Sequence, residues 1–360
     1  MKPLNILSFG AGAIGTYLGG SLALAGHHVV FVEQPTVVET LRAAGLTLDL
    51  SLDPRRGTQG RLTVAAPAVE FTTSLAEALA QTRFDVALFA LKSYDTPAAL
   101  ETLRPLAAQM PPVLCLQNGV DNEPALAAVL GPEKVIYGTV TSAIGRRGVG
   151  QIVLEKLRGV GVADGHPLSK ELVAALDGAF LNAQLFPKAA DMKWSKMLTN
   201  LLANPTSAIL DLTAAEVFAN PALYRLEIEQ LKECLAVMRA QGIGVVDLPG
   251  TPVRALALAT KLPLWLSKPF LSKAAGAGRG AKMPSFHIDL HSGRGHPGVA
   301  RRGKSEVSYL HGAVVRAGQQ TGVPTPVNQV LTETLLALTA GEIPLETFAR
   351  QPEKLLEKLK

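Results

Sequence analysis

Cysteine is scarce in this sequence: Cys115 and Cys234 are the only two among 360 residues. Two cysteines cannot form the disulfide framework of a small secreted protein, so we predict a chain that stays in a reducing compartment, the cytoplasm. The sequence also has no C-x-x-C pair, and its seven histidines are scattered. This pattern predicts no metal site.

Long uncharged apolar segments are missing as well. Residues 262–271 are apolar, but the segment is short, is interrupted by prolines and Lys268, and cannot span a bilayer. Residues 6–24 have the length of a signal peptide, although a nucleotide-binding loop explains their glycine pattern better. We therefore predict no association with a membrane.

A strong excess of one charge is also absent, since the formal net charge is +5 and most basic residues are interspersed with acidic ones. Aromatic residues make up only 5% of the chain, so few side chains are available to stack on bases. Basic residues cluster only at Arg294, Arg301, Arg302 and Lys304. We predict no nucleic-acid partner, and the modest basic excess suits a polyanionic cofactor and an anionic substrate.

What the chain does contain is a glycine-rich loop near its N-terminus. Residues 5–9 form an apolar run of strand length, and the loop that follows them matches G-x-G-x-x-G. A helix of small residues up to Ala25 and a second strand at 28–32 complete the context that this motif needs. The glycines allow a tight turn and the close approach of a pyrophosphate to the helix N-terminus. We predict that a dinucleotide binds at Gly10, Ala11, Gly12, Ala13, Ile14 and Gly15.

The end of the second strand bears on the choice of cofactor. Glu33 lies there, about twenty residues after the glycines, where an acidic side chain can bind the ribose 2′-hydroxyl of NADH. The 2′-phosphate of NADPH would instead favour a nearby arginine, and the nearest is Arg42. This argument favours NADH. The alternative is that Glu33 only ends the strand in solvent.

The first half of the chain alternates strand-like and helical segments, with further strands predicted at 85–90, 113–116, 135–140 and 150–157. Apolar strands that alternate with helices predict an α/β fold with a parallel sheet covered on both faces. After residue 188 the pattern is helical nearly throughout. We therefore predict a Rossmann-type dinucleotide-binding domain at 1–188 and an all-helical substrate and catalytic domain at 189–360. The active site is expected at their junction.

Two polar residues follow predicted strands of the sheet. Lys92 comes two positions after the strand at 85–90, and Asn118 follows the strand at 113–116. The carboxyl ends of parallel strands border the ligand crevice, so both side chains are expected beside the glycine loop. The alternative is an ordinary loop lysine and an Asn-Gly turn.

In the helical half, Lys196, Asn200 and Asn204 recur at steps of four residues in an otherwise apolar segment. Such spacing places them along one stripe of a predicted helix at 191–212. An ammonium group between neutral amides is suited to holding and protonating a carbonyl oxygen. Alternatively, Asn204, which precedes Pro205, caps a kink.

Ser285 and Glu306 are further candidates. Ser285 follows Met283-Pro284, and Glu306 lies at the start of a predicted helix at 305–321. A structural role is the alternative for both: Ser285 as a helix cap, and Glu306 as a first-turn acid favoured by the helix dipole.

Over nearly its whole length the sequence resembles the ketopantoate reductase (2-dehydropantoate 2-reductase) family. The resemblance is carried by motifs in both halves of the chain, of which the lysine–asparagine run and the E-x-x-Y-x-x-G run are the most specific. The matching pieces are Gly10-x-Gly12-x-x-Gly15, Ala90-Leu91-Lys92-Ser93, Gln117-Asn118-Gly119-Val120, Trp194-x-Lys196-x-x-x-Asn200-x-x-x-Asn204-Pro205, Pro284-Ser285, Ser305–Gly312 and Gly322–Asn328.

The resemblance implies hydride transfer from a nicotinamide cofactor, usually NADPH, to the ketone of 2-dehydropantoate, a small anionic 2-oxo acid. Lys196 would donate the proton, and Glu306 would contact the lysine and the substrate. Asn118 and Lys92 would lie by the nicotinamide, and Asn118 would also touch the substrate. Asn200, Asn204 and Ser285 would hold the substrate's hydroxyl and carboxylate. A homodimer is a further expectation from the resemblance.

The sequence departs from the family pattern in three places. No arginine follows the second strand, where Glu33 and Gln34 stand, so NADH remains open as the cofactor. Ser308 and His311 replace an aspartate and an asparagine of the glutamate helix. Extra residues, including 296–302, lie between Asp289 and Glu306. Two alternatives therefore stay open: an NADH-preferring dehydrogenase of another 2-oxo or hydroxy acid, and a non-enzymatic nucleotide-binding protein.

Overall fold

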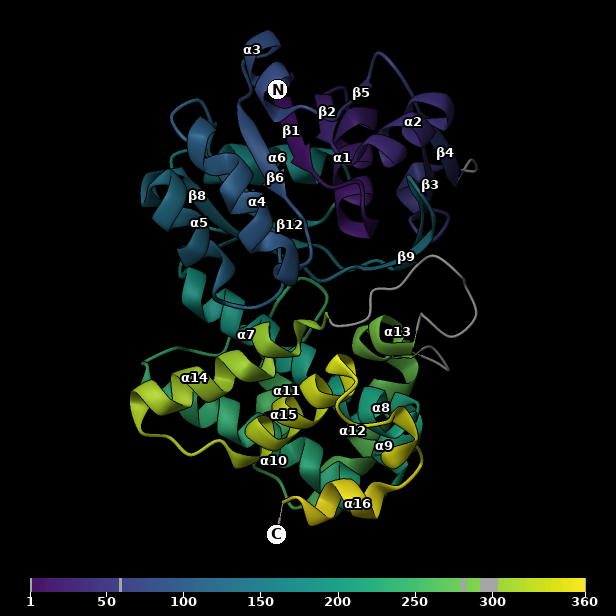
Figure 1. Ribbon diagram of the computed structural model, residues 1–360, viewed down its shortest axis with the longest axis vertical. Coiled ribbons are helices and arrows are strands. Elements are labelled where there is room, and N and C mark those ends of the chain that lie inside the picture. Colours follow the sequence, from purple (N-terminus) through teal and green to yellow (C-terminus); the bar gives the residue numbers. More distant parts are fainter. Residues whose placement is uncertain (1, 58–59, 280–282, 292–303, 360) are drawn as a thin grey trace. The chain divides into compact units, whose positions relative to one another are not determined.

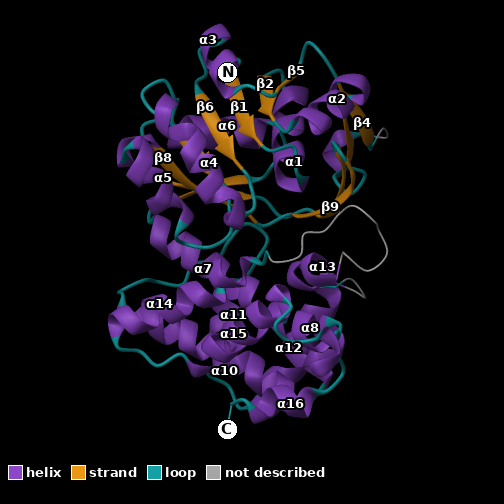
Figure 2. Cartoon of the chain, viewed as in Figure 1, coloured by secondary structure: helices purple, strands orange, loops and turns teal. Residues whose placement is uncertain are grey.

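The computed structural model describes residues 2–57, 60–279, 283–291 and 304–359, and the chain divides into two compact units (Figure 1). The first unit comprises Met1–Lys193 and Leu248–Thr251, and the second comprises Trp194–Asp247 and Pro252–Lys360. The division therefore falls within helix α7 (Ala189–Leu201). In the described ranges, every strand belongs to the first unit (Figure 2).

An eight-stranded sheet forms the centre of the first unit, with the strand order β12-β11-β8-β7-β6-β1-β2-β5. All neighbouring pairs are parallel except β11 and β8, which run antiparallel. The sheet confirms the predicted α/β class. Its strands are β1 (Asn5–Phe9), β2 (His28–Val32), β5 (Val69–Thr72), β6 (Val86–Phe89), β7 (Val113–Cys115), β8 (Val135–Val140), β11 (Val160–Ala163) and β12 (Ala183–Phe186).

Apolar side chains are buried on both faces of this sheet. In β1, Ile6 belongs to one core cluster and its neighbour Leu7 to a second, because successive residues of a strand point to opposite faces. Central strands covered on both faces read as continuous apolar runs, which is why they could be recognised in the sequence. The helices of this unit are α1 (Ala13–Leu24), α2 (Pro35–Ala44), α3 (Leu75–Gln81), α4 (Thr96–Leu103), α5 (Asn122–Leu130) and α6 (Ser169–Gly178).

A separate four-stranded sheet has the order β4-β3-β10-β9. The strand predicted at 150–157 is confirmed as β10, but its predicted place in the large sheet is wrong, because it belongs to this smaller sheet. Its strands are β3 (Leu46–Asp49), β4 (Arg61–Val64), β9 (Ala143–Gly148) and β10 (Gln151–Lys156). A turn at Gly150, where φ is +65°, sends the chain back so that β10 pairs antiparallel with β9 instead of extending the large sheet. In β10, Ile152 and Leu154 are buried while Gln151 and Glu155 are exposed, the alternation typical of a sheet with one covered face.

Helix α1 contacts strands of both sheets and is buried along most of its length. Its small residues make this close packing feasible. A Cβ atom added at Gly19 would lie 2.5 Å from the ring of Phe31, and one at Gly20 would lie 2.8 Å from Leu48. Added at Gly15, it would lie 1.9 Å from the carbonyl oxygen of Gly10. Glycine at these positions brings the helix against the glycine loop and both sheets.

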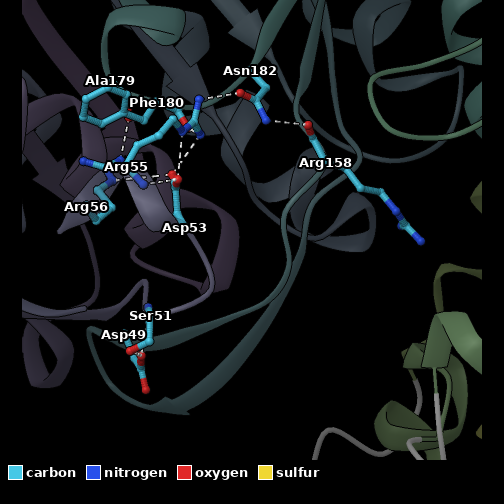
Figure 3. A network of polar contacts seen from close by, with 9 residues as sticks. All are labelled: Asp49, Ser51, Asp53, Arg55, Arg56, Arg158, Ala179, Phe180 and Asn182. Atoms are coloured by element: carbon cyan, nitrogen blue, oxygen red, sulfur yellow. Dashed lines mark hydrogen bonds and ion pairs between the residues drawn. The ribbon is translucent and has the colours of Figure 1, made fainter. Parts of the chain in front are cut away.

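A polar network in the first unit ties the loop after β3 to the turn that follows α6 (Figure 3). Arg55 forms an ion pair with buried Asp53 at 2.8 Å and donates to the Asn182 Oδ1 atom and the Phe180 carbonyl, both at 2.7 Å. Arg56 lies over the Phe180 ring at 4.9 Å. Burial acts to raise the pKa of Asp53, but hydrogen bonds from Arg55 and the charges of both arginines outweigh it and lower that pKa.

The second unit is helical in its described residues, as predicted. Besides the end of α7, its helices are α8 (Asn204–Leu210), α9 (Ala214–Ala219), α10 (Pro221–Ala240), α11 (Val253–Ala259), α12 (Leu264–Arg279), α13 (Ser285–His291), α14 (His311–Thr321), α15 (Pro326–Ala340) and α16 (Pro352–Glu357). Across the described part of the chain, no helix combines the length and the apolar character needed to cross a membrane.

Candidate functional site

The glycine loop connects β1 to α1 in the first unit. Gly10 has a φ of +90°, a conformation that favours glycine, and Gly12 is the N-cap residue of α1. The first backbone N–H groups of a helix have no partner within it, so this helix start can bind a phosphate. The loop therefore has the geometry of a pyrophosphate site.

Glu33, directly after β2, lies against this loop. Its Oε1 atom accepts a hydrogen bond of 2.5 Å from the N–H of Ala11, and its Oε2 atom accepts one of 3.1 Å from the N–H of Gln34. The side chain is partly buried. A carboxylate held at the glycine loop puts negative charge where strand β2 ends, which disfavours a second anionic group there.

Lys92 and Asn118 belong to neighbouring loops at the carboxyl ends of β6 and β7, as expected from the sequence. The Ser93 hydroxyl donates to the Asn118 carbonyl at 3.1 Å. The Asn122 side-chain amide donates to the same carbonyl at 2.8 Å and to the Ser93 hydroxyl at 3.2 Å. Both loops are therefore held together by a buried amide and a buried hydroxyl.

Gln117 adds a second connection between the two loops. Its amide nitrogen donates to the Leu91 carbonyl at 3.0 Å and to the Thr96 hydroxyl at 2.9 Å. Gln117 and Thr96 are buried. Because a buried hydrogen-bond network of this kind is costly to open, the backbone around Lys92 and Asn118 is preorganised.

A buried ion pair of the first unit was not predicted. The Lys193 ammonium lies 2.6 Å from the Glu123 carboxylate, and the two side chains are 3% and 0% exposed. The same ammonium donates to the carbonyls of Gln117 at 2.7 Å and Gly138 at 3.2 Å. Lys193 therefore attaches the start of α7 to α5, to the loop after β7 and to β8. The sequence carries no signal for it, because the two residues are distant along the chain.

The predicted single helix at 191–212 is wrong. Helix α7 ends at Leu201 and α8 begins at Asn204, with Ala203 between them in the left-handed conformation at φ +54°. Pro205 favours a new helix start, and the N–H of Ala203 donates to the buried Glu227 carboxylate at 2.6 Å, which stabilises the break.

Lys196 and Asn200 thus share α7, whereas Asn204 starts the next helix. The side-chain amide of Asn204 donates to the Asn200 carbonyl at 3.2 Å, so these two residues remain neighbours across the break. Lys196 and Asn200 are partly buried and Asn204 is buried.

Glu227 belongs to a buried hydrogen-bond network next to the break between α7 and α8. Its carboxylate accepts from the Thr206 hydroxyl at 2.6 Å and from the Gln230 amide at 2.5 Å. The side-chain Oε1 atom of Gln230 lies 3.0 Å from the His311 Nε2 atom. Burial lowers the pKa of His311 to about 3, so this histidine is neutral at neutral pH. The departure from the family pattern at His311 therefore serves a buried structural contact.

Asn204 and Ser285 are brought together although they are 81 positions apart. The Asn204 side-chain amide lies 3.4 Å from the Ser285 hydroxyl, and its Oδ1 atom accepts from the N–H of Phe286 at 3.1 Å. Asn204 therefore holds the first turn of α13. Ser285 itself is exposed at the start of that helix.

Glu306 is buried at the start of a short 3-10 helix, η5 (Glu306–Tyr309), and α14 begins only at His311. The predicted continuous helix at 305–321 is therefore wrong, because the chain bends at Leu310. Ser305 caps the 3-10 helix by accepting from the N–H of Val307 at 3.2 Å. Residues 296–302 of the extra segment, and the basic cluster up to Arg302, lie outside the described residues.

Comparisons with known proteins agree with this arrangement of fold and motifs. The family model "Ketopantoate reductase PanE/ApbA" matches residues 6–164, and the model of the corresponding C-terminal domain matches residues 188–339. The chain belongs to the ketopantoate reductase PanE/ApbA family. It is therefore an NAD(P)-dependent oxidoreductase, which excludes the non-enzymatic alternative.

Individual relatives are distant but cover the full length. A 2-dehydropantoate 2-reductase of Archaeoglobus fulgidus is 26% identical over 95% of this chain and 100% of its own length. One of Streptococcus pyogenes serotype M3 is 23% identical over 92% of this chain and 96% of its own.

Among solved structures, a PanE/ApbA family ketopantoate reductase from Ralstonia eutropha JMP134 has a TM-score of 0.74 at 24% identity, covering 94% of this chain and 99% of its own. The structure of D-mandelate dehydrogenase with NADH and anilino(oxo)acetate has a TM-score of 0.73 at 20% identity. The match covers 96% of this chain and 100% of the dehydrogenase chain. At these identities the likeness establishes the fold.

Proposed function

We propose that this enzyme reduces the ketone of 2-dehydropantoate (ketopantoate) to the alcohol, pantoate, with a hydride from NADPH or NADH. The observation that carries the proposal is the contact between Asn204 and Ser285, two residues of separate motifs that meet in the folded second unit. Full-length relatives that carry the name 2-dehydropantoate 2-reductase support the same substrate.

In the proposed mechanism, the protein holds the substrate and supplies a proton. Lys196, a partly buried lysine of α7, stabilises the negative charge that develops on the carbonyl oxygen and then donates its proton to that oxygen. When bound, the nicotinamide supplies the hydride to the carbonyl carbon. The ketone thus gains one hydride and one proton, and the cofactor is oxidised.

The remaining polar residues are proposed to position the reactants. Asn200, Asn204 and Ser285 bind the substrate's carboxylate and hydroxyl, with Glu306 beside the lysine. A nearby carboxylate favours the charged form of a lysine, so Glu306 would help to keep Lys196 protonated. Lys92 and Asn118, which lie in the preorganised loops after β6 and β7, contact the cofactor. Asn118 also contacts the substrate.

Product analysis tests the reaction directly. Ketopantoate incubated with enzyme and a reduced nicotinamide cofactor that carries two deuterium atoms at C4 should yield pantoate with one deuterium at its C2 carbon, as measured by mass spectrometry. Pantoate without the label would contradict direct hydride transfer, and no pantoate at all would reject ketopantoate as the substrate.

The second candidate function is an NADH-preferring dehydrogenase of another 2-oxo acid. The hydrogen bond between Glu33 and Ala11 favours it, because a carboxylate in this place suits a ribose hydroxyl better than a phosphate. D-mandelate dehydrogenase, which shares the fold, binds NADH in two solved structures. D-mandelate, assayed in the oxidative direction, is therefore a suitable second substrate to test.

Cofactor preference is expected to follow Glu33. The double substitution Glu33→Ala with Gln34→Arg removes a negative charge and adds a positive one, so the ratio of kcat/KM for NADPH to that for NADH should rise at least about tenfold. Initial rates with each cofactor at a fixed 2-oxo acid measure this ratio.

Glu39→Ala is a matched control, because Glu39 is an exposed glutamate on α2. It should leave the ratio unchanged. A ratio that moves less than about threefold in the double variant would reject Glu33 as the residue that selects the cofactor.

The homodimer stays a prediction, which sedimentation velocity would test.

A further inference from the structure

Outside the proposed reaction, one side-chain cluster of the second unit has the composition of a metal site. It consists of Asp211, directly after α8, and His287 and His291 on α13. One ligand atom from each of the three residues lies within 4.8 Å of the other two. None of the three residues is fully exposed.

The local fold explains why these residues meet. His287 and His291 are four residues apart on α13, so their side chains lie on one face of the helix, and their rings stack with centroids 4.1 Å apart. Asp211 ends α8 in the left-handed conformation at φ +52°, which aspartate tolerates better than most residues. Its Oδ1 atom lies 2.7 Å from the Nε2 atom of His287.

We propose that Asp211, His287 and His291 bind one divalent transition-metal ion, with Zn²⁺ as the first candidate. Two imidazole nitrogens and one carboxylate oxygen suit zinc and its neighbours, whereas Mg²⁺ and Ca²⁺ prefer ligand sets made of oxygen. Three protein ligands leave the fourth tetrahedral position to water or another small ligand.

The spacing of the three residues is close to what zinc requires. Metal–ligand bonds of about 2.0–2.2 Å in a tetrahedron put the ligand atoms about 3.3–3.6 Å apart. The contact of 2.7 Å between Asp211 and His287 would have to lengthen by about 0.6–0.9 Å. The Nε2 atom of His291 donates to the Ala208 carbonyl at 3.3 Å, and a small rotation of the ring would redirect this nitrogen to the ion.

A metal here would act on the structure of the second unit. Helix α13 starts with Ser285, and α8 starts with Asn204. An ion bound by Asp211 and the two histidines would cross-link these helices and fix the contact between Asn204 and Ser285. Zinc binding itself requires neither the proposed substrate nor a particular nicotinamide cofactor.

Zinc binding by the full-length chain tests the proposal. The protein is prepared without a histidine tag, dialysed against a chelator and then against buffer, and titrated with ZnCl₂ by isothermal calorimetry. We expect one equivalent of Zn²⁺ to bind and the midpoint of thermal unfolding to rise with zinc concentration, because the ion binds the folded state. Failure to bind zinc would overturn the proposal.

Two conservative variants separate a metal site from a simple hydrogen-bonded contact. Asn tolerates the left-handed conformation and can still accept from His287, so Asp211→Asn keeps the contact but replaces a carboxylate with a weak amide ligand. His291→Gln likewise keeps a donor for the Ala208 carbonyl. Each should weaken zinc binding by at least about 100-fold, because even outer-shell partners of a metal typically contribute about 10- to 100-fold.

His28→Gln is the matched control. His28 pairs with Glu70 at 2.9 Å but belongs to no group of three potential metal ligands among the described residues, so its loss should leave zinc affinity unchanged. Co²⁺ gives an independent readout through the visible absorption of a tetrahedral site. If Asp211→Asn and His291→Gln bind zinc as tightly as the unmodified chain, the proposed site is wrong.

Discussion

Replacement of Lys196 by alanine is expected to lower kcat by about 10²- to 10⁴-fold, the usual contribution of a positioned general acid. Without the ammonium group, the developing oxyanion loses both its nearest positive charge and its proton donor. The effect should fall on kcat and kcat/KM together, because the interaction strengthens as the oxygen becomes negative. Steady-state rates with the best 2-oxo acid measure it.

Two comparisons make this result specific to Lys196. Lys188→Ala removes an exposed lysine just before α7 and should leave the rate unchanged. Dinucleotide affinity, measured by nicotinamide fluorescence, should be similar in both variants and in the unmodified protein. Turnover by Lys196→Ala within a few-fold of the unmodified rate would reject Lys196 as the proton donor.

Replacement of Glu123 by alanine is expected to destabilise the first unit by about 3–5 kcal/mol. The substitution leaves the Lys193 ammonium, which is 3% exposed, without its carboxylate partner. At about 2–4 °C per kcal/mol for a unit of this size, its thermal midpoint should fall by roughly 6–20 °C. Circular dichroism during heating measures the midpoint.

The exposed pair of Lys232 and Glu229, at 2.9 Å, provides the comparison. Glu229→Ala should cost no more than about 1 kcal/mol, because water and salt screen an exposed pair. The double variant Glu123→Leu with Lys193→Met removes both buried charges and should recover most of the lost stability. A midpoint for Glu123→Ala equal to that for Glu229→Ala would contradict this explanation of the buried pair.

The elements that could be predicted from the sequence are those whose signals are local. Strands β1 and β2 and the glycine loop were predicted because buried parallel strands read as continuous apolar runs, and because Gly10, Gly12 and Gly15 have a fixed spacing. The positions of Lys92 and Asn118 followed from β6 and β7, which were recognised by the same kind of apolar run. The helical character of the second unit followed from its periodicity.

The features that were missed depend on contacts between distant residues. The break at Ala203 is stabilised by the carboxylate of Glu227, which lies 24 positions further along the chain. Strand β10 belongs to the smaller sheet because it pairs with β3, which lies about a hundred residues earlier in the chain. No local sequence pattern predicts a pairing between strands so far apart. The Lys193–Glu123 pair has no local pattern either.

The prediction of no metal site differs from the proposed zinc site, and the zinc titration decides between the two. The prediction rested on the scattered distribution of the seven histidines over the whole chain. The spacing of four residues between His287 and His291 is a local helical signal that this overall count concealed. Asp211 could be added only from the fold, because it lies 76 positions before His287.

The most direct test of the proposed reaction is steady-state oxidation of NADPH and NADH with ketopantoate and a panel of other 2-oxo acids, followed at the nicotinamide absorbance. We expect ketopantoate to be reduced with a kcat/KM of about 10⁴ M⁻¹s⁻¹ or more. Efficient reduction of a different 2-oxo acid alone would support the second candidate function. No turnover of any 2-oxo acid with either cofactor would contradict the central claim that this enzyme is a 2-oxo acid reductase.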